Sequence, residues 1–183
     1  MSTETDETPA RSVPSPQIVQ HASPGAVVVG VDGSEGSRSA LEVACDEADL
    51  RNLPIAAVVA WTPPEVCVTP YPLVASAHDL HGAATDLATR EVHEVLTARA
   101  RRGASAPTVE LIAASGPAAV VLERVSAEAS MIVVGHRGRG AVASRLIGSV
   151  GLSTVVHARC SVLVVRTPDD RPPRFDEHES HAT

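Results

Sequence analysis

Five short apolar runs, rich in β-branched residues, alternate with longer segments of helical periodicity along the middle of the chain. The runs cover residues 26–31, 55–61, 108–113, 131–135 and 161–166. Strands that are apolar throughout are typical of a parallel sheet buried on both faces. The alternation therefore predicts a single α/β domain: a doubly wound, five-stranded parallel sheet sandwiched by helices, in a Rossmann-like fold.

Four helices are expected between these strands. The first is predicted from apolar residues spaced between Leu41 and Ala48, with Ser34 or Ser37 as its N-cap and Asn52 beyond its end. The other three are predicted along the apolar stripe from Ala84 to Leu96, after Gly116-Pro117, and from Ser149 to about His157.

The two ends of the chain differ in composition from its middle. Residues 1–24 and 168–183 are rich in Ser, Thr, Pro and charge and lack apolar periodicity, so we expect disordered tails around a domain at 25–167. The amino terminus has no apolar core typical of a signal peptide, and no apolar run approaches the ~18 residues that span a bilayer. The three cysteines form no C-x-x-C pair. A cytoplasmic protein without a membrane partner is expected.

Composition excludes several functions. The net charge of −7 and an aromatic content of 2% argue against nucleic acid as a partner. All fifteen basic residues are Arg, so a Walker A lysine and a Schiff-base lysine are both excluded. His78 and His81 lack the closed ligand set of a structural metal site, and we predict no metal ligands and no catalytic residues.

Asp32 follows the first predicted strand, at the edge where open α/β sheets bind ligands. The neighbouring Gly30, Gly33 and Gly36 are spaced by three, which departs from the G-x-G-x-x-G dinucleotide fingerprint. A carboxylate suits an exocyclic amine or a ribose hydroxyl better than a pyrophosphate. The alternative is that Asp32 and Ser34 are only turn and N-cap residues.

A glycine- and arginine-bearing segment follows the fourth predicted strand. Residues 129–168 hold five arginines and no carboxylate, and the spacing G-x2-G-x9-G-S begins at Gly135. Amides beside glycine can approach a phosphate closely, and a helix starting at Ser149 adds its positive end. This segment and Asp32 leave the same edge of the sheet, so they can converge. The alternative is that the glycines only form turns and the arginines only solvated surface.

With this spacing the chain resembles the universal stress protein family, in its ATP-binding branch, which is marked by G-x2-G-x9-G-(S/T) after the fourth strand. Gly135, Gly138, Gly148 and Ser149 fit that motif without a gap. The resemblance covers residues 25–167 and includes Val31-Asp32-x-Ser34, Val59-Ala60-Trp61 and the closing pattern from Val155 to Arg166.

The resemblance implies strand order 3-2-1-4-5, with Asp32 and Gly135 facing one pocket. It implies that Gly30, Val31 and Asp32 hold adenine and ribose, that Trp61 and Val134 form apolar walls, and that Gly135, Arg137, Gly138, Gly148, Ser149 and Val150 wrap the phosphates. From the residues alone, Trp61 is as readily a core side chain as a wall of the pocket.

Two positions depart from the family pattern. Gly151 stands where family members often carry Ser or Thr, so a phosphate contact is lost unless a late helix start lets Ser153 replace it. His136 replaces a more usual small residue. We favour an exposed loop histidine there over a phosphate donor.

These observations predict an ATP-binding universal stress protein, a regulatory module in stress response with ATP as ligand, with or without Mg²⁺, and at most slow hydrolysis. One alternative is an enzyme that hydrolyses adenine nucleotides or transfers an adenylyl group. The other is a nucleotide-free dimeric interaction protein. A homodimer is expected through the apolar last strand, Ser161 to Arg166, because exposed strand edges invite pairing.

Overall fold

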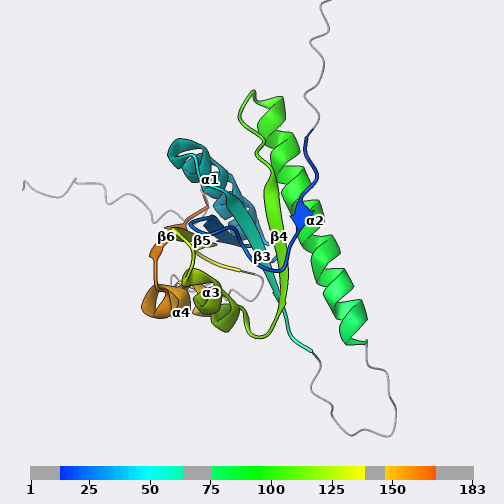
Figure 1. Ribbon diagram of the computed structural model, residues 1–183, viewed down its shortest axis with the longest axis vertical. Helices are drawn as coiled ribbons and strands as arrows, with labels where there is room; N and C mark the ends of the chain where they lie inside the picture. The colour runs from blue at the N-terminus through cyan, green and yellow to red at the C-terminus, as the bar shows by residue number, and fades with distance from the viewer. Residues whose placement is uncertain (1–12, 64–75, 139–146, 168–183) are drawn as a thin grey trace, which may run out of the picture.

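The computed structural model describes residues 13–63, 76–138 and 147–167, and every structural statement below concerns these ranges. Six strands form one sheet in which all paired neighbours are parallel, in the order β1-β4-β3-β2-β5-β6 (Figure 1). Their bounds are β1 Gln17–Ile18, β2 Val27–Gly30, β3 Ile55–Trp61, β4 Val109–Ser115, β5 Met131–Gly135 and β6 Ser161–Val165.

The five predicted strands are present in the predicted order, but the sheet has six strands and not five. The additional strand, β1, lies within residues 1–24, which we expected to be a disordered tail. It pairs with β4, and Val19 N–H donates a hydrogen bond to the Leu111 carbonyl at 2.9 Å. Ser23 donates from its amide and its hydroxyl to the Glu110 carboxylate, at 2.8 and 2.5 Å. A two-residue strand held by partners distant in sequence leaves no periodicity to detect.

The four helices occur where the sequence predicts them. They are α1 Glu35–Arg51, α2 Ala77–Arg101, α3 Ala118–Ser126 and α4 Ser149–His157. Ser34 is the N-cap of α1 and accepts from the Ser37 amide, while Asn52 ends the helix in the left-handed conformation. Helix α2 begins upstream of its apolar stripe because Ser76 and Asp79 form a capping box. No helix in the described ranges has the length and apolar character needed to cross a bilayer.

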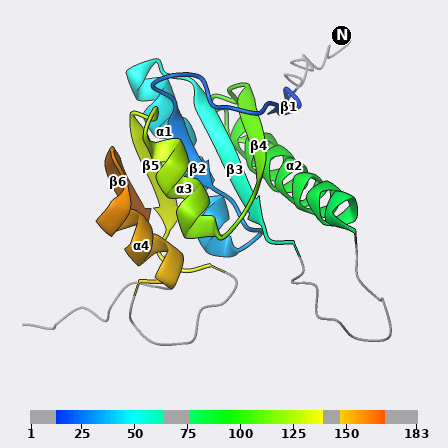
Figure 2. The ribbon, with the colours of Figure 1, turned by 60° about the horizontal axis from the view of Figure 1, so that its bottom comes forward.

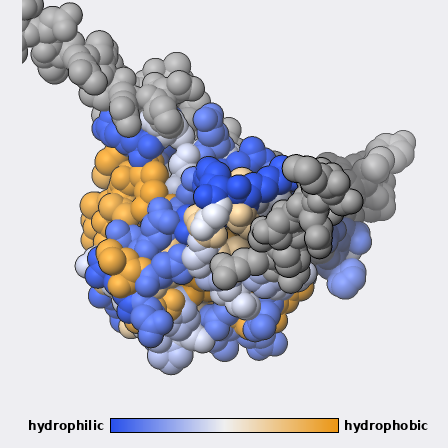
Figure 3. All heavy atoms as spheres, turned by 90° about the horizontal axis from the view of Figure 1, so that it is seen from above, coloured by the Kyte–Doolittle hydropathy of each residue, from blue (hydrophilic) through white to orange (hydrophobic). Residues whose placement is uncertain are grey.

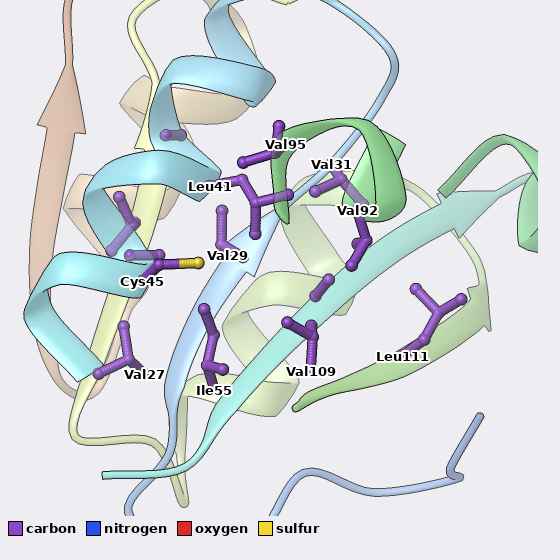
Figure 4. Packing of buried hydrophobic residues seen from close by; sticks show 14 of the residues in the cluster. Val27, Val29, Val31, Leu41, Cys45, Ile55, Val92, Val95, Val109 and Leu111 are labelled. Atoms are coloured by element: carbon purple, nitrogen blue, oxygen red, sulfur yellow. The ribbon is translucent and has the colours of Figure 1, made fainter. Parts of the chain in front are cut away.

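Helices cover both faces of the sheet, so the central strands β2, β3 and β5 are largely buried, whereas β1 is exposed and β6 is only partly buried. Figure 2 shows α3 and α4 in front of the sheet and α1 behind it. Alternate β2 residues separate into two cores: Val27 and Val29 pack with Leu41 of α1 and Val92 of α2 (Figure 4), whereas Val28 packs toward α3. This division explains why the strands read as continuous apolar runs.

The chain reverses direction across the sheet between β2 and β5. From β2 it crosses through α1 to β3, whereas α3 leads to β5 on the other side of β2. The carboxyl ends of β2 and β5 therefore lie side by side, with Val29 opposite Val133. In open α/β sheets this reversal leaves a crevice beyond the strand ends.

Candidate functional site

A cavity of about 270 Å³ opens at the carboxyl ends of β2 and β5. Ten of the eleven residues predicted as binding residues line it: Gly30, Val31, Asp32, Val134, Gly135, Arg137, Gly138, Gly148, Ser149 and Val150. The eleventh, Trp61, does not. The other described lining residues are Ser34, Ser37, Val58, Ala60, Ala118, Leu122 and Gly151. Residues 139–146 lie outside the described ranges, and they include Arg139 and Arg145, two of the five arginines of the glycine- and arginine-bearing segment.

Backbone-to-backbone contacts shape the floor of this cavity. A Cβ on Gly135 would lie 2.6 Å from the carbonyl carbon and oxygen of Gly36, and a Cβ on Gly36 would overlap the Arg137 carbonyl oxygen. Side chains at either position would separate the first turn of α1 from the end of β5. The glycines therefore allow the two segments to meet, which is a packing role in addition to any contact with a ligand.

Asp32 lies against the glycine loop on the opposite side. Its Oδ1 accepts a hydrogen bond from the Ser34 amide at 3.0 Å, as expected for a turn residue. A Cβ on Gly138 would lie 2.6 Å from its Oδ2, so the carboxylate and the loop share one narrow space. Asp32 therefore forms the turn and also lines the cavity, while its role toward a ligand stays a prediction.

Within the described ranges, the first three amides of α4 make no intrahelical hydrogen bond. The first intrahelical bond runs from Leu152 N–H to the Gly148 carbonyl at 2.9 Å, so the amides of Ser149, Val150 and Gly151 precede the hydrogen-bond ladder. Gly148 caps the helix without a side-chain hydrogen bond. All four residues line the cavity. Such a helix terminus favours an anion through its free N–H groups and its dipole.

The opposite wall is apolar. Val58 and Ala60 of β3, Leu122 of α3 and Val134 of β5 line this part, and they lie on one face of the sheet. Since strand side chains alternate, Trp61 lies with Val59 on the other face, which explains its absence from the lining. Its ring meets His81 of α2 edge-on, with centroids 5.9 Å apart.

His136 differs from its predicted setting, and the condition under which Ser153 would compensate for Gly151 is not met. His136 is 2% exposed, so the prediction of an exposed loop histidine is wrong. Its amide donates to the Val165 carbonyl at 2.6 Å, which continues the β5–β6 pairing by one residue and draws the side chain inside. Because α4 begins at Ser149, Ser153 lies in its second turn, away from the lining, and does not replace the hydroxyl missing at Gly151.

Glu91 of α2 is a site-adjacent residue that the sequence interpretation missed. It is 2% exposed, and its Oε2 accepts a 2.7 Å hydrogen bond from the Gly33 amide, beside Asp32. Its Oε1 contacts the hydroxyl of Ser37, which lines the cavity. Burial raises the pKa of this carboxyl, and the nearby Asp32 adds to the effect. The signal was a carboxylate within the apolar stripe of α2, three residues after Ala88.

No group of three His, Cys, Asp or Glu side chains suited to holding a metal occurs within the described ranges. His78 and His81 lie in the first turns of α2. Cys45 and Cys160 are free thiols, and burial raises the pKa of Cys45 to about 12.

Comparison with known proteins identifies the fold and its family. A model of the universal stress protein family (Usp) matches residues 25–166. The chain belongs to the universal stress protein family. The sheet with its four helices agrees with the fold of solved members.

Two curated relatives come from Mycobacterium tuberculosis (strain ATCC 25618 / H37Rv). Universal stress protein Rv2623 is 34% identical over 149 residues, which cover 81% of this chain and 48% of the relative. Universal stress protein Rv2005c is 34% identical over 154 residues, which cover 84% of this chain and 48% of that relative. This universal stress protein chain thus spans about half the length of the curated relatives it matches.

Two solved structures align with the chain over nearly their whole length. A universal stress protein in complex with cAMP is 25% identical, with a TM-score of 0.54 over 78% of this chain and 97% of that one. The hypothetical protein MJ0577 is 18% identical, with a TM-score of 0.58 over 79% of this chain and 98% of that one. This likeness concerns the fold alone.

Proposed function

We propose that this universal stress protein binds an adenine nucleotide, ATP, in the cavity between β2 and β5, with or without Mg²⁺. In this proposal it is a regulatory nucleotide-binding module in stress response that hydrolyses ATP slowly at most. The proposal depends on one observation: Asp32 and the residues of the first three α4 amides, Ser149 to Gly151, line the same cavity, and these amides make no intrahelical hydrogen bond. The solved relative in complex with cAMP supports an adenine nucleotide as the ligand class.

The two ends of the cavity suit the two ends of a nucleotide. The wall of Val58, Ala60, Leu122 and Val134 offers an apolar surface for a base, and Asp32 is an acceptor for an amine or a hydroxyl. The amides of Ser149 to Gly151 and the Arg137 guanidinium suit phosphate oxygens. With about 270 Å³, the cavity is near the lower end of small-molecule sites, so we place the nucleoside inside and the phosphates along the rim.

Slow hydrolysis follows from the chemistry of the lining. Asp32 is the carboxylate among the described lining residues, and it lies on the proposed nucleoside side, bonded to the Ser34 amide. The chain has no lysine to stabilise charge that develops on a transferred phosphoryl group. Binding without rapid turnover is therefore the expected behaviour.

The test is calorimetric titration of the purified protein with ATP, GTP and cAMP, together with mass identification of any nucleotide released on denaturation. Gly138→Asp should abolish ATP binding, because the new side chain meets the Asp32 carboxylate and adds negative charge. Gly82→Asp adds the same charge where a Cβ has nothing within 4 Å, and it should bind like wild type. Absence of binding heat with ATP in wild type would overturn the proposal, and rapid multiple-turnover release of ADP or AMP would favour an enzyme.

We also propose that two copies pair through β6. In the described part of the chain β1 covers the β4 edge, which leaves β6 as the other border of the sheet. Beside it, α4 exposes Leu152, Val155 and Val156 at 54, 48 and 65%. Figure 3 shows hydrophobic side chains gathered on one side of the molecule. An apolar edge strand next to an apolar helix suits pairing between identical copies.

A further inference from the structure

Glu91 is a buried carboxyl group that the proposed binding chemistry does not use. It occupies the core-facing stripe of α2 between Ala88 and Val92, both fully buried, and is itself 2% exposed. Charged side chains are rarely buried to this extent without a compensating arrangement. Its partners therefore indicate what it does.

Both carboxyl oxygens of Glu91 reach the segment between β2 and α1. Oε2 accepts from the Gly33 amide at 2.7 Å, and Oε1 contacts the Ser37 hydroxyl. The same Ser37 Oγ lies 2.9 Å from the Ser34 carbonyl oxygen. Ser34 and Ser37 line the cavity, and Gly33 directly follows Asp32. The Glu91 side chain thus connects helix α2 to the segment that borders the cavity.

The number of protons in this cluster distinguishes two states. The Ser37 hydroxyl has one hydrogen, and the Ser34 carbonyl can only accept. An ionised Glu91 is also only an acceptor, so Ser37 can then satisfy one neighbour but not both. A protonated Glu91 donates to Ser37 Oγ, which frees the Ser37 hydrogen for Ser34, while Oε2 still accepts from Gly33. The neutral carboxyl therefore satisfies all the contacts present in the structure.

The surroundings favour the same state. Burial raises the pKa of the Glu91 carboxyl and the Asp32 carboxylate on the adjacent loop raises it further, whereas the contacts from Ser37 and Gly33 and the Arg38 guanidinium lower it. Arg38 on α1 is itself paired with Glu94 at 3.5 Å, and both side chains are exposed, so its charge is screened. Because burial is the largest of these contributions, the pKa of the Glu91 carboxyl is raised overall.

We propose that neutral Glu91 is a positioning residue that holds the Gly33–Ser37 segment in its binding shape, and that ionisation of Glu91 weakens binding of a phosphorylated ligand. Ionisation leaves either the Ser34 carbonyl with only its bond from the Arg38 amide, or the Glu91 carboxylate without its partner from Ser37. It also adds a second negative charge behind Asp32, next to a cavity suited to an anion. The ligand part of this inference rests on the proposed nucleotide function.

The test compares ATP affinity of wild type and Glu91→Gln by calorimetry between pH 5.5 and 8.5. The Gln amide can donate to Ser37 and accept from Gly33, so it mimics the neutral acid without titrating. At each pH the dissociation constant of wild type is divided by that of Glu91→Gln, because this cancels the effect of the titration of ATP itself. We expect this ratio of dissociation constants to be near one at acid pH and to rise to about ten as Glu91 ionises, which corresponds to the loss of one good interaction.

Two controls make each outcome decisive. Glu94→Gln removes an exposed carboxylate one turn along the same helix and should follow wild type at every pH. In the ligand-free protein, the Gly33 amide proton shift should titrate with pH in wild type and not in Glu91→Gln, which tests the Glu91 contact even if ATP is not the ligand. An affinity ratio of one throughout, weaker binding by Glu91→Gln at acid pH, or a Gly33 shift that does not titrate would each overturn the proposal.

Discussion

Gly36 and Gly135 meet backbone to backbone, so a Cβ atom on Gly135 would lie 2.6 Å from both the carbonyl carbon and the carbonyl oxygen of Gly36. The contact joins the first turn of α1 to the end of β5, where the cavity begins. Backbone atoms cannot rotate aside as a side chain can. Folding and pocket formation therefore depend on the same glycine pair.

Gly135→Ala should destabilise the fold by about 1–3 kcal/mol, the typical cost of forcing extra volume into a packed interior. Gly82→Ala is the matched control, because a Cβ there meets nothing within 4 Å and alanine favours a helix by about 1 kcal/mol. Urea unfolding of both variants measures the difference. Equal stability of Gly135→Ala and wild type would show that the two segments can separate without loss.

Arg99→Ala should cost about 2 kcal/mol of the free energy of unfolding. The side chain is 4% exposed; it donates to the Glu42 and Ser105 carbonyls at 3.2 and 2.9 Å and to Asp46 at 2.7 Å, thus tying α2 to α1. Hydrogen bonds from a charged group contribute about 1.5–3 kcal/mol.

The exposed pair of Arg38 and Glu94 provides the comparison for Arg99. Its atoms are 3.5 Å apart and both side chains are about half exposed, so Arg38→Ala should change stability by less than about 0.5 kcal/mol. Guanidinium chloride screens charge, so urea is the denaturant to use. Similar losses in the two variants would contradict the role of Arg99 in tying α2 to α1.

The features that sequence reasoning recovered have local causes. Continuous β-branched runs predicted the five main strands because burial on both faces requires apolar residues at every position. The spacing from Gly135 to Ser149 predicted the loop and helix start, since close backbone approach and a free helix end both depend on neighbouring residues. Ser34 precedes α1 as its N-cap, and Asn52 ends the helix as a left-handed C-cap, both as expected.

The features that were missed depend on tertiary partners. Strand β1 has two residues and exists through its pairing with β4. Trp61 was assigned to the pocket, although counting alternate residues from Val58 and Ala60 places it on the other face. Glu91 interrupts an apolar stripe at helical spacing, and such an interruption is the sequence signal of a buried carboxyl. Only the fold reveals what such a residue contacts.

Stability should depend on pH through Glu91. Burial raises the pKa of its carboxyl above the ordinary value of 4.5, so the folded state binds the proton more tightly than the unfolded state. The free energy of unfolding should then fall as pH rises from about 4.5 through the raised pKa. Glu91→Gln lacks this titration, so wild type should lose stability relative to the variant across that window. Urea unfolding between pH 4 and 8 measures the difference, and a pH-independent difference would contradict this expectation.

Cys45 should resist alkylation in the folded protein. Burial raises the pKa of its thiol to about 12, which leaves a thiolate fraction of about 10⁻⁴ at pH 8. Cys160 is only partly buried and should react at least about tenfold faster with iodoacetamide. Peptide mass spectrometry resolves the two sites, and labelling in urea confirms that both can react. Equal rates in the folded state would show that α1 opens readily.

Val156→Glu should weaken self-association, if two copies pair beside β6. Val156 is 65% exposed on α4, so a charge there should leave the core intact while opposing burial against a second copy. Leu50→Glu is the matched control, because Leu50 is 80% exposed near the end of α1. Sedimentation velocity over a range of concentrations should show a dimer for wild type and Leu50→Glu and at least a tenfold weaker dimer for Val156→Glu, about 1.4 kcal/mol. A monomeric wild type at micromolar concentration would refute pairing, whereas a Val156→Glu dimer of unchanged affinity would restrict the interface to the edge of β6.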